Sequence, residues 1–173
     1  MDIIEYLDIY DENKNKTGKK KIRYKEPLVD GEFSVGVQAT ILNSKGEILI
    51  TQRSADSRVC PLMWECNGGA VLAGEDFLDA LVREISEEMG LSLKKEDAIY
   101  LKSVKRPHHF KEIYLFKKDI LASELKFVDG EALDAKWVDI ETFVKMFEEK
   151  EIVQSVDFDK DDYEKCLKLL NMR

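Results

Sequence analysis

The sequence predicts a single domain of mixed α/β class, and three observations lead to that prediction. The chain has 173 residues, an ordinary length for one domain that buries its own core. Hydrophobic residues make up 44% of the chain and charged residues 36%, a balance that excludes a disordered or low-complexity protein. Strand-like and helix-like segments follow one another irregularly rather than in strict alternation, which favours a mixed α/β architecture.

The first 30 residues are expected to form a β-hairpin appended to a main domain at residues 31–173. Residues 3–10 alternate enough to be a strand, and a second short strand is expected at 20–24. The polar stretch DENKNKTGK joins the two, and Gly18 is its expected pivot.

The main domain is expected to consist of strands interrupted by helices. Apolar and β-branched runs bounded by turn residues predict strands, and apolar residues three and four apart predict helices. Gly68 and Gly69 are expected to break one short strand, and Gly90 stands where a glycine commonly ends a helix. The expected strands lie at 33–42, 47–53, 64–74, 98–105, 112–118 and 135–138, and the expected helices at 76–89, 140–148 and 163–170.

Charge and composition exclude several classes of protein. The net charge of −8 has the wrong sign for a surface that coats nucleic acid. No apolar run is long enough for a membrane span, and the acidic start is unlike a signal peptide. The three cysteines make no disulfide framework and are interpreted as free thiols, which predicts a cytoplasmic protein.

Two segments have strongly biased charge. Residues 69–91 carry six acids against one base, and residues 14–25 carry seven bases and no acid. The acidic segment indicates either cation binding or a solvated helix face. The basic segment is either a contact for phosphates or a solvated hairpin tip.

The acidic segment is expected to fold as an amphipathic helix. At 100° per residue its leucines, Val82, Ile85 and Met89 form one apolar stripe. Glu84, Glu87 and Glu88 fall beside that stripe, within reach of one common point. Three neighbouring carboxylates repel one another, and a hard divalent cation such as Mg²⁺ or Mn²⁺ removes that cost. Arg83 is placed to hold one of the carboxylates, and Glu75 lies near the helix N-terminus.

The pattern over residues 69–91 resembles the complete signature of the Nudix hydrolase family. It reads Gly69, five residues, Glu75, seven residues, then REISEEMGL from Arg83 to Leu91, without a departure from the signature. The wider resemblance covers about residues 33–150, including the strand ILITQR and the later segment AKWVDI.

The resemblance implies an α/β/α sandwich around a mixed sheet that hydrolyses a nucleoside diphosphate linked to another group. Water would attack phosphorus with the help of Mg²⁺ or Mn²⁺. Glu84, Glu87 and Glu88 would be metal ligands, and Gly69 would add its backbone carbonyl. Arg83 would orient the glutamates, and Glu75 would support them or bind an extra metal ion. The implied partner is a small-molecule diphosphate, with neither a membrane nor nucleic acid.

The signature leaves the general base open among Glu87, Glu112 and Glu131. Arg53 ends a strand beside the glycine segment and is a candidate contact for substrate phosphate, with a surface ion pair as the alternative. Trp64 is a candidate platform for a nucleobase, with a role in the core as the alternative.

The opening YLDIYDENKNKTGK is similar to the isopentenyl-diphosphate-isomerase-like branch of the same family. Isopentenyl-diphosphate isomerase is therefore an alternative function, in which Cys60 and Glu112 would be the proton-transferring groups. The absence of histidine beside Cys60 argues against it. A non-catalytic nucleotide-sensing module is a second alternative. An exposed hairpin edge at residues 1–25 would permit a homodimer.

Overall fold

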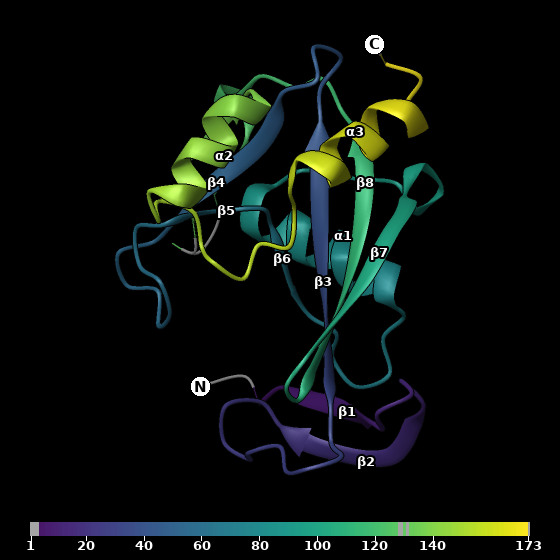
Figure 1. The fold of residues 1–173 in the computed structure, drawn as a ribbon. Helices are drawn as coiled ribbons and strands as arrows, with labels where there is room; N and C mark the ends of the chain where they lie inside the picture. Colours follow the sequence, from purple (N-terminus) through teal and green to yellow (C-terminus); the bar gives the residue numbers. More distant parts are fainter. Residues whose placement is uncertain (1–3, 128–129, 131, 173) are drawn as a thin grey trace.

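The computed structural model describes residues 4–127, 130 and 132–172. Within them a two-stranded hairpin lies at one end of a seven-stranded sheet, and Figure 1 shows the hairpin below the sheet. The hairpin consists of β1 (Tyr6–Tyr10) and β2 (Lys16–Ile22). The large sheet consists of β3 (Ser34–Leu42), β4 (Ile48–Arg53), β5 (Trp64–Glu65), β6 (Gly68–Ala70), β7 (Ile99–Arg106), β8 (His109–Lys117) and β9 (Ala132–Val138).

The large sheet is mixed, as the sequence predicted. Its main path runs β5-β4-β3-β8-β7, while β6 pairs with β3 and β9 pairs with β4. The pair β3–β8 is parallel, from Ser34 opposite His109 to Leu42 opposite Lys117. The other pairs in this sheet that the structure describes are antiparallel. A parallel pair at the centre requires a long connection, and that connection contains the acidic helix.

Helices cover both faces of the sheet, which confirms the α/β/α sandwich. One buried cluster joins β3 to α1 (Phe77–Met89) through residues such as Val37, Leu81 and Ile85. The opposite cluster joins the sheet to α2 (Ile140–Glu148) and α3 (Lys160–Leu169) through Phe143 and Cys166. Figure 1 shows α1 behind the sheet and α3 in front of it. None of the helices in the described residues is long and apolar enough to cross a membrane.

The hairpin turn differs from the prediction, because Gly18 is not its pivot. Gly18 lies inside β2, with a φ of 82°. The turn comes earlier, where the Asp11 carboxylate accepts the backbone N–H groups of Asn13 and Asn15, at 2.9 Å each. An aspartate that bonds the backbone two residues ahead makes a turn without glycine. The second strand therefore starts at Lys16, four residues before the predicted start.

Two further boundaries differ from the prediction. Gly68 and Gly69 do not break a strand but form β6, and the break falls at Cys66 and Asn67. A side chain at Gly68 would place its Cβ 2.0 Å from the Val37 carbonyl oxygen, so this strand pairing requires glycine. His109 lies in β8 rather than in a loop, because only two residues turn the chain between β7 and β8.

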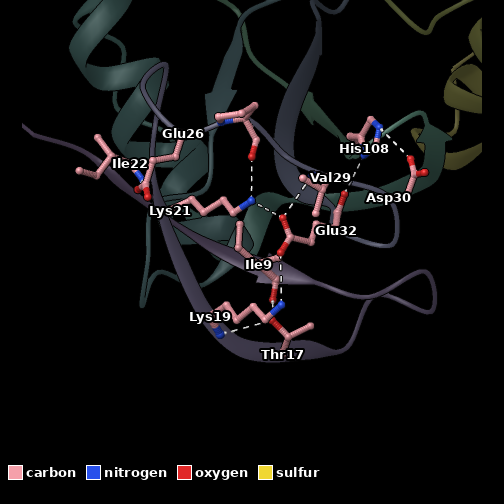
Figure 2. A network of polar contacts seen from close by, with 11 residues as sticks. Ile9, Thr17, Lys19, Lys21, Ile22, Glu26, Val29, Asp30, Glu32 and His108 are labelled. Carbon is pink, nitrogen blue, oxygen red and sulfur yellow. Dashed lines mark hydrogen bonds and ion pairs between the residues drawn. The ribbon is translucent and has the colours of Figure 1, made fainter.

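The basic stretch at residues 14–25 connects the hairpin to the main domain. Lys19 and Lys21 of β2 both reach the carboxylate of Glu32, which also accepts the Val29 N–H at 3.3 Å (Figure 2). The hydrogen bond from Lys21 lowers the pKa of Glu32 to about 2. Lys14 reaches further and donates to the buried carboxylate of Glu112 in β8, at 2.5 Å. Most of these basic side chains are therefore paired with carboxylates of the protein itself.

Candidate functional site

A cleft of about 1300 Å³ lies where the hairpin, the loop at 54–58, the segment at 67–69 and helix α1 meet. The hairpin is held at this cleft by the loop before α1. The Tyr6 carbonyl accepts the Ala73 N–H at 2.7 Å, and the Asp8 carboxylate accepts the Gly74 N–H at 2.9 Å. The appended hairpin thus forms one wall of the same cleft whose other wall carries the acidic signature.

Helix α1 is fixed in place by its two ends and by its apolar stripe. Asp76 caps the N-terminus by accepting the Leu78 N–H at 2.9 Å, whereas Glu75, the acid expected near this end, accepts the Leu72 N–H at 2.9 Å. Gly90 adopts the left-handed conformation, with a φ of 63°, and ends the helix. Leu81 and Ile85 are fully buried against the sheet. The glutamates beside this stripe are therefore held at the cleft.

The three glutamates of α1 all line the cleft but differ in exposure. The side chain of Glu87 is 60% exposed, whereas Glu84 is buried with only 8% of its surface accessible. Burial raises the pKa of Glu84. Of the two interpretations left open for the acidic segment, a solvated helix face does not fit Glu84, because β6 packs over it. A side chain at Gly69 would place its Cβ 2.1 Å from Cδ of Glu84.

Arg83 is the centre of the hydrogen-bond network at the cleft. Its guanidinium donates twice to Glu75, at 2.7 and 2.9 Å, and once each to Glu84 and Glu87, at 3.0 Å. It also donates to the Ala70 carbonyl at 3.2 Å. The Glu75 hydrogen bonds lower the pKa of that carboxyl and raise the pKa of Arg83. One guanidinium therefore donates hydrogen bonds to three carboxylates, so this hydrogen-bonded network contains more acids than bases.

Two polar residues that the motif does not include position Glu88. The buried amide of Asn67 donates to the Glu88 carboxylate at 3.1 Å, and its oxygen accepts the Thr51 hydroxyl at 3.0 Å. These residues come from the β5–β6 junction and from β4. The sequence signal for Asn67 is weak: it is one amide beside two glycines. Only the tertiary structure shows its contact with the signature helix.

The donor set of this wall suits a hard divalent cation, because it consists of carboxylates and backbone carbonyls. Among the described residues, no group of three or more carboxylate, thiol and imidazole side chains is close enough together to hold an ion as it stands. The present arrangement directs Glu84 and Glu87 towards Arg83.

The other candidate residues are divided between the cleft and the rest of the molecule. Arg53 pairs with Glu65 at 2.6 Å, as the ion-pair alternative expected, and it also lines the cleft. Its contact with a substrate phosphate stays a prediction. Trp64 packs against the core cluster on the α2 and α3 side, with Lys136 Nζ 4.1 Å from its ring centroid. Trp64 is not among the residues that line the cleft.

Of the three candidate bases, only Glu87 lies in the cleft within the part of the chain that is described. Glu112 is buried and accepts hydrogen bonds from Lys14, from Ser103 at 2.6 Å and from Tyr100 at 3.1 Å. It does not line the cleft. Glu131 lies outside the described residues.

Comparison with known proteins agrees with this geometry. Residues 32–156 match the family model of the NUDIX domain. An uncharacterised Nudix hydrolase of Listeria monocytogenes is 32% identical over 140 residues, which cover 78% of this chain and 80% of that protein. The crystal structure of DR0079 from Deinococcus radiodurans superposes with a TM-score of 0.71 at 22% identity, over 95% of this chain and 98% of that one.

A second solved structure contains a nucleotide and a metal ion. It is a bifunctional NMN adenylyltransferase/ADP ribose pyrophosphatase from Francisella tularensis, complexed with AMP and a manganese ion. It superposes with a TM-score of 0.59 at 23% identity, over 85% of this chain and 43% of that one. Both structural comparisons show a shared fold.

Proposed function

The chain belongs to the Nudix hydrolase family, and we propose that it uses Mg²⁺ or Mn²⁺ to hydrolyse a diphosphate bond in a nucleotide-type substrate. The observation that carries the proposal is the arrangement around Arg83. Three glutamates of one helix line a cleft large enough for a nucleotide, and Arg83 donates to two of them, Glu84 and Glu87, while it also holds Glu75. Manganese in the Francisella tularensis structure supports the choice of metal.

The proposal assigns Glu84, Glu87 and Glu88 as the residues that hold the metal, with the backbone carbonyl of Gly69. The absence of a side chain at Gly69 lets the Glu84 carboxylate lie directly against β6. Burial raises the pKa of Glu84, so a nearby cation would stabilise its charged form. When bound, the metal would neutralise the diphosphate and acidify a water molecule.

The chain's own residues would orient the substrate and the proton transfer. Arg83 holds Glu75 with two hydrogen bonds and fixes the direction of the helix carboxylates. Asn67 does the same for Glu88. Glu87 is the most exposed of the three α1 glutamates in the cleft, so we assign it as the group that accepts a proton from the attacking water. Positioning and electrostatics would supply most of the rate enhancement.

The isomerase alternative lacks a matching site in the structure. It needs an acid and a base on opposite faces of one substrate. Neither Cys60 nor Glu112 lines the cleft, and Glu112 is paired with Lys14. His109 is half-buried at the start of β8, and desolvation lowers its pKa to about 4. The geometry therefore favours hydrolysis.

The experiment is a hydrolysis assay with a panel of nucleoside triphosphates and nucleoside diphosphate sugars. We expect turnover that requires Mg²⁺ or Mn²⁺ and that a chelator abolishes. Reaction in H₂¹⁸O should place the label in a phosphate product, because water attacks phosphorus. Nucleotide binding without turnover would instead identify a sensing module. Deuterium incorporation into isopentenyl diphosphate in heavy water, lost in Cys60→Ala, would identify an isomerase.

A further inference from the structure

The cleft wall opposite α1 carries a group of cations arranged around one tyrosine. Tyr24 follows β2 and is 68% exposed, and it lines the cleft. The guanidinium carbon of Arg23 lies 4.6 Å from its ring centroid, and that of Arg58 lies 4.8 Å away. Lys20 lines the same cleft. The two arginines come from the hairpin and from the loop after β4, so the fold brings this group together.

These cations differ in how far the protein neutralises them. Arg23 pairs with Glu5 at 2.7 Å. For Arg58 and Lys20, by contrast, no described residue provides a carboxylate in an ion pair, although Asp56 lines the same cleft. Most of the other hairpin cations are bound to carboxylates of the main domain or of the hairpin itself. Arg58 and Lys20 therefore present positive charge to the cleft.

The loop that carries Arg58 is held by the strand before it. The Arg53 side chain donates to the Val59 carbonyl at 2.9 Å, and the Gln52 amide donates to the Leu62 carbonyl at 3.0 Å. The Arg53 N–H donates to the Met63 carbonyl at 2.9 Å. These bonds fix both sides of the loop, and the Tyr24 ring holds the guanidinium at its tip. An arginine held in this way loses little side-chain freedom when it binds an anion.

The positive wall lies close to the acidic wall. Arg23 and Arg58 line the same cleft as Glu84 and Glu87 of α1. One cleft therefore contains two ends of opposite charge. The α1 end has an excess of carboxylates and suits a cation with its diphosphate. The Tyr24 end has an excess of guanidinium and ammonium groups and suits a second anionic group.

We propose that Arg58, with Arg23 and Lys20, binds an anionic group of the substrate that lies beyond the scissile diphosphate. The substrate class is then a nucleotide with an additional phosphate, such as a nucleoside triphosphate, rather than a diphosphate linked to a neutral sugar. Guanidinium groups suit phosphate because they donate two parallel hydrogen bonds. This inference rests on the proposed function of the α1 end.

The test compares matched substrate pairs that share one base: ATP with ADP-glucose, GTP with GDP-glucose, CTP with CDP-glucose and UTP with UDP-glucose. We expect the wild-type protein to favour the triphosphate for each base that it accepts, by about tenfold in kcat/KM. Arg58→Met should raise KM for the triphosphate by about tenfold, the usual contribution of one charge-assisted hydrogen bond, and leave the sugar nucleotide unchanged. Arg58→Lys should keep part of the preference because it keeps the charge.

Lys25→Met is the matched control, since Lys25 is an exposed cation beside Tyr24 that does not line the cleft. It should leave both KM values unchanged. The triphosphate preference should also weaken with added salt in the wild-type protein and less so in Arg58→Met. Equal activity of the wild type on both members of a pair would overturn the inference. An equal loss on both in Arg58→Met would also overturn it, because the arginine would then contact the diphosphate itself.

The design separates this inference from the proposed function. If the wild-type protein hydrolyses none of the eight compounds with either metal, the proposed function itself fails. If it hydrolyses them and loses that activity in Glu87→Gln, the proposed function stands, and the Arg58 variants alone decide the substrate class.

Discussion

Two groups of carboxylates in this molecule have opposite charge balances. On α1, Glu75, Glu84 and Glu87 share the single guanidinium of Arg83. Where the hairpin meets the main domain, Glu32 receives both Lys19 and Lys21, and Glu112 receives Lys14. The first group has more acids than bases, whereas each acid of the second has its own cation.

We interpret this difference as the one between the proposed metal site and a structural contact. A buried carboxylate with a matched lysine needs no further partner, and it connects two parts of the chain. Carboxylates that share one guanidinium repel one another, and a divalent cation would relieve that repulsion, as we propose for the α1 group. Sequence composition alone does not distinguish the two cases, because both contain glutamates near basic residues. The contacts in the structure do distinguish them.

The sharpest test of the comparison removes one charge from the α1 group. Glu87→Gln and Glu88→Gln should each lower turnover by about 10²- to 10⁴-fold while the protein stays folded, because each loses a metal ligand or a general base. Steady-state kinetics with Mg²⁺ and thermal unfolding measure the two effects. Glu164→Gln is the control, since Glu164 is an exposed glutamate on α3. Near-wild-type turnover in both α1 variants would contradict the site assignment.

A second test moves a carboxylate without removing it. In Gly69→Ala the new Cβ would meet Cδ of Glu84 at 2.1 Å, so the carboxylate has to shift. A misplacement of about 1 Å at a reacting centre costs about 100-fold in rate, and we expect a loss of that order. Metal affinity, measured by calorimetry with Mn²⁺, should fall as well. Unchanged kinetics would show that the position of Glu84 against β6 does not matter.

The matching test in the second group should show the reverse pattern. Glu112→Gln should leave turnover nearly unchanged and lower stability by about 1–3 kcal/mol, because Lys14 loses its ionised partner. For a chain of this size that corresponds to a fall in Tm of roughly 2–4 °C per kcal/mol. A loss of turnover comparable to that of Glu87→Gln would show that Glu112 is catalytic, and the division between the two groups would fail.

The smallest expected effect concerns the pH dependence of stability. The pKa of Glu32 falls from an unfolded value of 4.5 to about 2 in the folded chain, where it accepts the Lys21 hydrogen bond. A depressed carboxyl pKa stabilises the fold above the unfolded value, and that contribution disappears as pH falls through the folded value. The free energies of unfolding of the wild type and of Glu32→Gln should therefore differ most at neutral pH. That difference should shrink as the pH falls from 4.5 to 2. If the difference in unfolding free energy does not change with pH, ionisation of the Glu32 carboxylate does not stabilise the fold.

Residues close together in the sequence determined the fold class and the acidic helix. The apolar stripe of α1 and its Gly90 terminus depend on spacings of a few residues, and both are confirmed. Helix α2 also begins and ends at the predicted residues. These features depend on local hydrogen bonds and on helical periodicity, so a single sequence contains enough information to place them. The roles assigned to the cleft residues and the homodimer stay predictions.

The tertiary structure alone decided which distant residues meet, because these contacts depend on packing between segments rather than on local preference. Nothing near Lys14 indicates that it will cross to Glu112 in β8, nor does the composition of the hairpin show that Arg23 and Tyr24 will join Arg58 at the cleft. Burial of Glu84 likewise follows from the pairing of β6 with β3, which places Gly69 over the helix. The cations and strands that surround each carboxylate come from another segment of the chain, and only folding brings that segment close.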